Sequence, residues 1–269
     1  MNETFVNEIR DAVAGVLEDK YVEVREVEKA NGVIYTGISI RTEGCNIAPT
    51  IYLDEDRSVE ENVQRVLETY AQNQPKQELD MEWFTDYEQV KEKLSIMLTS
   101  KPISGLATRK APGFDDLYMH AYVLLKNTVL GAGNVKVTKE HMKKWGVSNA
   151  KLFADALKSA QNITPANSMS MASMLGMLGQ EEEMLEPMRV LSNKDTVMGA
   201  ATILYTKVKE NTYMIPSSIH EVILLDGEVV DPRELNVIIN AVNREAVAPE
   251  EYLSNHAYRF NGKKWENVA

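Results

Sequence analysis

The sequence contains very little cysteine, since Cys45 is the only one among 269 residues. A single thiol cannot form an internal disulfide, and one free cysteine is more typical of a reducing compartment than of an exported protein. Long apolar runs are also missing, and the longest, such as residues 121–125, are far too short to cross a bilayer. The first residues, MNETFVNEIRD, lack the basic start and apolar stretch of a secretory signal. We therefore expect a cytoplasmic protein that does not associate with membranes.

Positive charge is in deficit, because 29 Lys and Arg residues stand against 40 Asp and Glu residues, for a net charge of −11. Binding to the phosphates of nucleic acid requires clustered Lys and Arg. The densest basic group here is only Lys139, Lys143 and Lys144. We expect no direct binding to a nucleic-acid backbone. An acidic surface can bind a basic protein partner or imitate nucleic acid, but ordinary solubility is the simpler explanation and the one we favour.

Residues that hold metals or cofactors are sparse. The H-E-x-x-H pattern is absent, and no two histidines stand at a metal-binding helical spacing. The glycines at 131 and 133 lack the third glycine of a dinucleotide fingerprint, and a turn explains them. The sequence therefore predicts no metal and no cofactor. The four histidines are His120, His141, His220 and His256.

Two further groups have a structural and a functional interpretation. Cys45 has no neighbouring cation or helix start that would lower the pKa of its thiol, so we interpret it as structural or incidental. Asp54, Glu55 and Asp56 follow a predicted strand. Their expected role is to favour the positive start of the next helix, with a magnesium site as the alternative.

The first hundred residues predict an N-terminal lobe with the order helix, strand, strand, strand, helix. Residues 3–18 have a helical apolar stripe, and Asn31-Gly32 supplies a hairpin turn between two alternating runs. Residues 47–53 predict a third strand, and Ser58 with Glu61 forms a capping box for a second helix. A linking helix is predicted from Thr85 through residue 98. We place the lobe at residues 1–100, with its boundary near 72–81 or within the Pro- and Gly-rich loop 101–113.

Residues 101–269 predict a second lobe of mixed helices and strands. Strands are expected at 118–125, 129–137, 188–191, 213–215 and 221–225, and helices after Thr138 and Ser148 and over 200–209. Asp231-Pro232 starts another helix, and a terminal hairpin follows near 257–265. The sequence thus predicts an α+β fold of two lobes, with mixed or mostly antiparallel sheets flanked by helices. The expected buried face of the helix after Asp231 is Leu235, Ile238, Ile239 and Val242.

Methionine is concentrated in one part of the second lobe. Seven of the 13 methionines lie between Met169 and Met198. Methionine side chains adapt to varied partners, so the segment 163–188 is a candidate binding surface or lid. The alternative is a loosely packed helix followed by a loop.

Four segments resemble a known family: NIAPTIYL at 46–53, HMKKWGVS at 141–148, MIPSSIHEVILL at 214–225 and APEEYLSNHAYRF at 248–260. Together with their spacing they resemble the uncharacterised bacterial domain of unknown function 5688, over nearly the whole chain. The family has no assigned activity. The resemblance therefore implies a bacterial cytoplasmic protein and no particular catalytic residue.

The strongest candidate for a catalytic site is the segment with Ser217, Ser218, His220 and Glu221, which brings two hydroxyls, an imidazole and a carboxylate to a strand junction. Nucleophilic catalysis requires a hydroxyl within hydrogen-bond reach of a base that a third group orients. Proximity along the chain does not provide that geometry, and the G-x-S-x-G elbow is absent. A turn held by hydroxyl-to-backbone bonds is the other interpretation.

Three functions remain open at this level, and the sequence does not decide whether the protein is an enzyme. The first is an accessory protein that binds a macromolecule, through the Met-rich segment, the cleft between lobes or the acidic surface. The second is a hydrolase or transferase with its site near Ser217, Ser218 and His220. The third is an acidic inhibitor from a mobile element that imitates nucleic acid.

Overall fold

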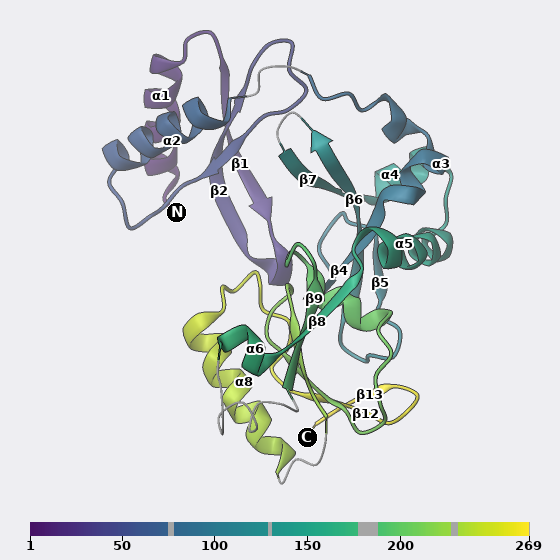
Figure 1. The fold of residues 1–269 in the computed structure, drawn as a ribbon. Coiled ribbons are helices and arrows are strands. Elements are labelled where there is room, and N and C mark those ends of the chain that lie inside the picture. Colours follow the sequence, from purple (N-terminus) through teal and green to yellow (C-terminus); the bar gives the residue numbers. More distant parts are fainter. Residues whose placement is uncertain (75–77, 129–130, 177–187, 227–230, 269) are drawn as a thin grey trace. The chain divides into compact units, whose positions relative to one another are not determined.

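The computed structural model describes residues 1–74, 78–128, 131–176, 188–226 and 231–268 (Figure 1). Its sheets are antiparallel and its helices flank them, which confirms the predicted α+β class. The chain forms two compact units. The first comprises Met1–Lys29, Val33–Glu82 and Lys126–Ala132, and the second Ala30–Gly32, Trp83–Leu125 and Gly133–Ala269.

The first unit is a three-stranded sheet with two helices. Along the chain these are α1 (Glu3–Val16), β1 (Tyr21–Glu28), β2 (Ile34–Arg41), β3 (Thr50–Tyr52) and α2 (Val59–Asn73), and the strand order is β1-β2-β3. Both helices lie on the same side of the sheet (Figure 1). Pro49 precedes β3, where its missing N–H costs no ladder hydrogen bond.

The core of the first unit forms because the apolar stripes of both helices meet the alternate apolar residues of β2. Ile9 of α1, Ile38 and Ile40 of β2, and Val66 of α2 are completely buried. The predicted capping box is present, since the Ser58 hydroxyl accepts from the N–H of Glu61 and the Glu61 carboxylate accepts from the N–H of Ser58.

The second unit begins with a sheet of four strands. Its elements are α3 (Tyr87–Val90), β4 (Leu94–Thr99), β5 (Thr108–Lys110), β6 (Tyr118–Thr128), β7 (Gly131–Lys136), α4 (Lys139–Trp145) and α5 (Asn149–Ile163). The strand order is β4-β6-β5, and β7 also pairs with β6. The predicted starts of α4 at Thr138 and α5 at Ser148 are confirmed, because both hydroxyls accept backbone hydrogen bonds there.

The predicted helix from Thr85 to residue 98 is wrong. The helix is a single turn that begins after Asp86, and Leu94–Thr99 is the strand β4, which pairs with β6. Every residue of β4 is buried. A strand that is covered on both faces has a continuous apolar run, which periodicity cannot distinguish from a helix. This pairing also groups residues 83–100 with the second unit.

The second unit also contains a sheet of six strands in the order β13-β12-β10-β11-β9-β8. The strands are β8 (Ala166–Ser170), β9 (Met188–Asn193), β10 (Tyr213–Pro216), β11 (Val222–Leu225), β12 (Tyr258–Phe260) and β13 (Trp265–Asn267). The helices of this part are α6 (Met171–Leu175) and α8 (Pro232–Ala246), and Gly199–Leu204 forms a 3-10 helix. None of the described helices is long and apolar enough to cross a membrane.

Two expectations for this region need correction. The segment 200–209 is helical over only part of its length, as the 3-10 helix Gly199–Leu204. In α8 only Leu235 and Ile239 of the four expected core residues are buried, whereas Ile238 and Val242 are exposed. The helix packs through a narrow stripe that is completed by asparagines, which turns the other aliphatic residues outward.

Candidate functional site

The four predicted site residues lie in the hairpin turn between β10 and β11. Ser217 donates from its hydroxyl to the Glu221 carboxylate at 3.3 Å. The Ser218 hydroxyl accepts from the backbone N–H of His220 at 3.0 Å, and the N–H of Ser218 donates to the carbonyl of Glu221 at 3.2 Å. The structure therefore brings these residues together through hydrogen bonds of the kind that hold a turn.

The imidazole of His220 connects two other segments of the second unit. Its Nδ1 accepts from the backbone N–H of Met198 at 3.1 Å, so Nε2 carries the proton in the neutral ring. Nε2 lies 3.3 Å from Oε1 of Glu251. Because the accepting nitrogen is already bonded to a backbone amide, it is not available as a base for a serine hydroxyl in this geometry. A catalytic role for the four residues stays a prediction.

A second cluster, which sequence reasoning missed, joins Asp116 to the segment 254–258. Nε2 of His256 lies 3.0 Å from Oδ2 of Asp116, and the Tyr258 hydroxyl donates to Oδ1 at 3.0 Å. Burial pushes the pKa of the Asp116 carboxyl upward, but the contacts with His256 and Tyr258 outweigh it and hold that pKa below its ordinary value. Burial raises the pKa of Tyr258, so the hydroxyl stays protonated as a donor.

The contacts of this second cluster have a structural role, because they hold the residue before β6 to the segment 254–258. The Tyr258 hydroxyl lies 3.1 Å from the Ser254 hydroxyl, and Tyr258 is completely buried. Asp116 precedes β6, 142 residues from Tyr258, so no local pattern could have identified the contact. The sequence feature that points to this cluster is the close spacing of Ser254, His256 and Tyr258 within one segment.

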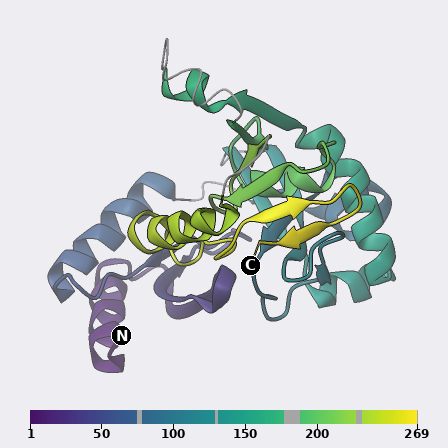
Figure 2. The ribbon, with the colours of Figure 1, turned by 90° about the horizontal axis from the view of Figure 1, so that it is seen from below.

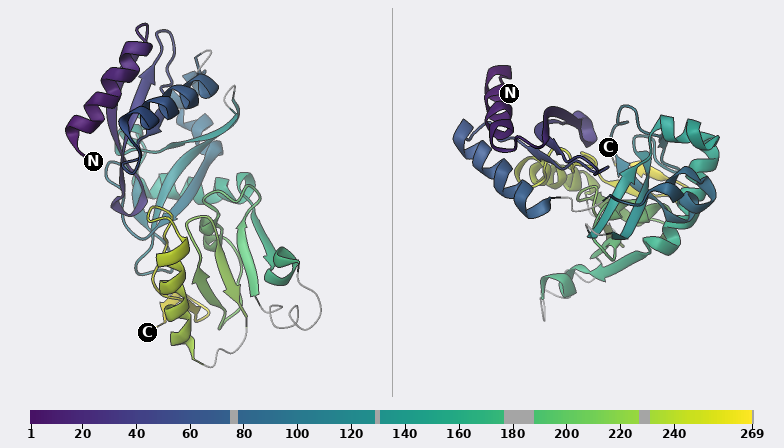
Figure 3. Two further views of the ribbon diagram at one scale, coloured as in Figure 1. Left: turned by 90° about the vertical axis from the view of Figure 1, so that its left-hand side faces the viewer. Right: turned by 90° about the horizontal axis from the view of Figure 1, so that it is seen from above.

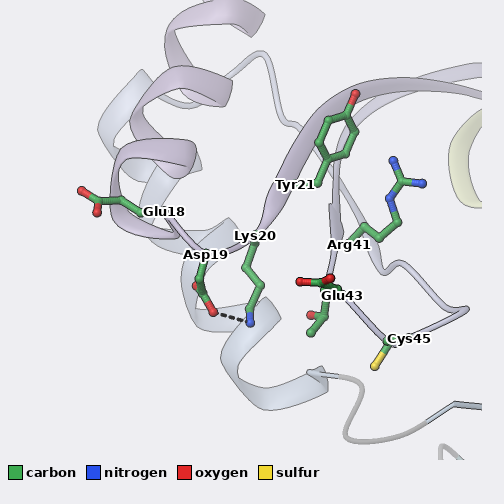
Figure 4. Close-up of a pocket in the computed structure, with 9 residues that line it drawn as sticks. Glu18, Asp19, Lys20, Tyr21, Arg41, Glu43 and Cys45 are labelled. Carbon is green, nitrogen blue, oxygen red and sulfur yellow. Dashed lines mark hydrogen bonds and ion pairs between the residues drawn. The ribbon is translucent and has the colours of Figure 1, made fainter.

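Cys45 lines an open cavity of about 540 Å³ in the first unit (Figure 4). The loop before β1 contributes Lys20, whose ammonium pairs with Asp19 at 2.6 Å. On the other side of the hollow, the guanidinium of Arg41 lies 4.6 Å from the centre of the Tyr21 ring. Figure 4 shows Arg41 and Tyr21 extending away from Lys20 and Cys45. Acidic and basic side chains thus alternate around the hollow, and no single ligand charge is favoured.

The acidic loop after β3 is organised by its own hydrogen bonds. Asp54 accepts from the N–H of Asp56 at 3.1 Å and from Nε of Arg57 at 2.9 Å. The hydrogen bond from Arg57 is the main reason that the pKa of Asp54 is lowered. Within the described residues no group of three or more His, Cys, Asp or Glu side chains could hold a metal ion.

The Met-rich segment begins on an exposed strand. Residues 166–170 form β8, the last strand of the six-stranded sheet, and α6 follows directly. β8 follows the end of α5 and leads to α6, and these two elements project from the rest of the second unit (Figure 2). Met169 is 45% exposed and Met174 is 50% exposed. The part that is described is thus a strand and one short helix, and residues 177–187 lie outside the described residues.

The outer edge of β8 has the chemistry to accept another strand. Among the described strands, β9 is its only neighbour, with Met169 opposite Val190. An edge strand presents backbone N–H and C=O groups that lack a ladder partner, and proteins usually protect such edges with charge or proline. β8 has the sequence ANSMS, with neither.

The edges of the other sheets in the described part of the chain contrast with β8. The exposed strand β1 has the sequence YVEVREVE, in which four charged side chains discourage pairing. β4 is uncharged but completely buried. Of these three edge strands, β8 is the one that combines exposure with an uncharged sequence.

Antiparallel sheets flanked by helices define an α+β protein. The chain belongs to the family of unknown function DUF5688, whose model matches residues 2–262. This confirms the resemblance seen in the sequence. The comparisons with curated proteins and with solved structures gave no match.

Proposed function

We propose that this chain is a bacterial cytoplasmic accessory protein that binds a protein partner by adding an extended segment of that partner to β8. In this mode the backbone groups of the edge strand supply the hydrogen bonds, and alternate side chains supply the selectivity. The observation that carries the proposal is the exposed, uncharged and proline-free sequence of β8. The single cysteine supports the cytoplasmic compartment.

The chemistry around β8 restricts the partner. The net charge of −11 favours a basic segment, because opposite charges speed association and reject acidic competitors. Met169 and Met174 present flexible thioether side chains beside the edge, and these pack against aliphatic or aromatic residues of varied shape. The expected partner is an extended segment in which apolar residues alternate with polar or basic ones.

The size of the site sets the expected affinity. β8 has five residues, so the number of new backbone hydrogen bonds is small. Each contributes a net stabilisation of about 0.5–1.5 kcal/mol. Together with contacts to two methionines, this corresponds to dissociation constants in the range of about 1 to 100 µM. Such an affinity suits a reversible accessory contact.

The proposal can be tested by selecting peptides against the full-length chain. A displayed library of random 12-residue peptides is selected on the wild type and counter-selected on a Ser168→Lys/Met169→Lys variant. Lysines on an edge strand discourage pairing while leaving the fold intact, because both residues are exposed. The control is Met174→Lys, which adds one positive charge on α6, and the single variant Met169→Lys matches it in charge on the edge strand.

We expect enriched peptides with alternating apolar residues and net positive charge. Their affinity should fall at least about tenfold on Ser168→Lys/Met169→Lys, which corresponds to about 1.4 kcal/mol, and much less on Met174→Lys. Peptides that bind the edge variant as tightly as the wild type would contradict the proposal. Peptides that lose affinity only on Met174→Lys would move the site from the edge to the Met-rich surface.

A further inference from the structure

Met169 is the one large apolar side chain in β8, whose sequence is ANSMS. It lies opposite Val190 of β9 in the antiparallel ladder, and Val190 is buried. Directly opposed side chains of neighbouring strands have Cβ atoms about 4.5–5.5 Å apart, so a strand added on the outer side of β8 would place one of its own residues beside Met169 at this spacing. Met169 is therefore the apolar contact that β8 offers to an added strand.

The thioether of Met169 is open to solvent. Among the described methionines, Met169 is 45% and Met174 is 50% exposed, whereas Met97, Met119 and Met214 are at most 3% exposed. β8 and α6 lie at the margin of the six-stranded sheet, on the side away from α8 (Figure 3). Small oxidants in solution thus reach the two exposed sulfur atoms directly, and they reach the buried ones only when the core opens.

We propose that Met169 is a redox-sensitive modification site, at which oxidation by hydrogen peroxide to the sulfoxide releases the partner segment from β8. This inference rests on the proposed edge function. In the reaction the sulfur lone pair attacks one peroxide oxygen, so that an S–O bond forms and the O–O bond breaks. Sulfur loses two electrons, and the leaving hydroxide takes the remaining proton from the transferred oxygen and departs as water.

The sulfoxide changes what β8 offers to an added strand. Oxidation converts a flexible apolar side chain into a polar one. The sulfoxide oxygen next to Val190 must leave water when a residue of the partner covers it, and burial of a polar group without a hydrogen-bond partner is unfavourable. The change is reversible, because methionine sulfoxide reductases return the side chain to methionine. Binding at the edge therefore follows the redox state around the protein.

The first measurement follows the oxidation itself and involves no peptide. The full-length chain is treated with hydrogen peroxide, and each methionine is followed by mass spectrometry of proteolytic fragments. Met169 and Met174 should be oxidised at least about tenfold faster than Met97 and Met214, because the buried pair reacts only through opening of the core. A Met169 that reacts as slowly as the buried pair overturns the proposal.

The second measurement is the affinity of an edge-binding peptide for the oxidised chain. A peptide from the library selection that contains neither Met nor Cys is labelled with fluorescein. It is titrated with the untreated chain and with the oxidised chain, after catalase has removed the peroxide. Oxidation should raise its dissociation constant at least about threefold, which is the size of one cross-strand contact. Far-ultraviolet circular dichroism verifies that the oxidised chain is folded.

Matched leucine variants locate the effect, since other exposed methionines such as Met1 are oxidised as well. Met169→Leu nearly keeps the volume and removes the reactive sulfur, so its affinity should be the same with and without peroxide treatment. Met174→Leu should keep the sensitivity of the wild type. Met169→Gln introduces a polar side chain of similar length, and it should weaken binding about threefold without any peroxide.

The outcomes separate this proposal from the function on which it rests. A selection that yields no peptide dependent on the edge overturns both. A peptide that binds at the edge with the same affinity before and after oxidation overturns only the redox proposal. So does a loss of affinity that persists in Met169→Leu, because the reacting sulfur then lies elsewhere.

Discussion

His120 is a buried imidazole held between two threonines. Its Nε2 lies 2.9 Å from Oγ1 of Thr99 and its Nδ1 lies 3.1 Å from Oγ1 of Thr108. The Thr99 hydroxyl donates to the carbonyl of Lys101, so it accepts from Nε2–H of the neutral ring. Burial lowers the pKa of His120 from 6.5 to about 4. The ring therefore stays neutral in the folded state at pH 5, whereas the unfolded chain takes up a proton.

This difference predicts a loss of stability in mild acid. Stability from His120 is present above the unfolded pKa of 6.5 and is lost as the pH falls toward 4. Between pH 7.5 and pH 5 the loss amounts to about 2 kcal/mol. Urea unfolding at both pH values, in wild type and in His120→Gln, measures it. An equal acid sensitivity in the two proteins would show that His120 is not the cause.

Two glycines of the first unit differ in the space around them. A Cβ at Gly37 would lie 2.8 Å from the carbonyl oxygen of Ile51, whereas a Cβ at Gly15 would meet nothing within 4 Å. Gly37→Ala should therefore lower the free energy of unfolding by roughly 1–3 kcal/mol. Gly15→Ala, within α1, should raise it by up to about 1 kcal/mol because alanine favours a helix. Urea unfolding of both variants measures whether the two changes in the free energy of unfolding have opposite signs, as we expect.

At the scale of residues, the sequence predicts local contacts well and distant ones poorly. The caps at Ser58, Thr138 and Ser148 are predicted correctly because a cap bonds to amides two or three positions away. The contact of His220 with Glu251 joins residues that are far apart in the sequence, and so does the pairing of Asp116 with His256. Such contacts depend on sheet register, which a single sequence does not specify.

At the scale of elements, the wrong predictions arise where an apolar pattern is compatible with two different structures. The run LSIMLT fits a helix stripe and a buried strand alike. In α8 the aliphatic residues surround much of the helix, and the asparagine bonds to backbone carbonyls select the packed side. Polar side chains that fix the rotation of a helix are invisible to a periodicity that counts only apolar residues.

The rotation of α8 leads to a direct prediction. Leu235→Ala should destabilise the protein by roughly 2–4 kcal/mol, because its side chain is buried. Ile238→Ala should change stability by less than about 0.5 kcal/mol, because its side chain is exposed. Chemical unfolding of both variants measures the contrast. Equal losses of stability in the two variants would mean that Ile238 faces the core, as the apolar periodicity of the sequence predicts.

At the scale of the molecule, each unit has its own core. The cluster around Ile9, Ile38 and Val66 lies in the first unit, and the cluster around Leu98, Phe153 and Tyr258 lies in the second. All three tryptophans, Trp83, Trp145 and Trp265, belong to the second unit. Tryptophan fluorescence therefore reports on the second unit alone, whereas circular dichroism reports on the helices of both.

Because each unit has its own core, we predict that the two units unfold separately. Ile9→Ala should destabilise the first unit by about 2–4 kcal/mol, since it leaves a cavity in that core. The early part of the circular dichroism transition should move to lower urea, while the fluorescence transition stays in place. A fluorescence transition that moves by the same amount would show that the chain unfolds as one cooperative body.

The central claim is that the outer edge of β8 receives an extended segment of a partner protein. Residue-resolved amide hydrogen exchange, with and without a selected peptide, tests it most directly. Binding should slow exchange at the outward amides of residues 166–170 at least about tenfold, because each becomes part of a sheet ladder. A bound peptide that leaves the exchange rates of β8 unchanged and slows amides elsewhere would contradict the claim.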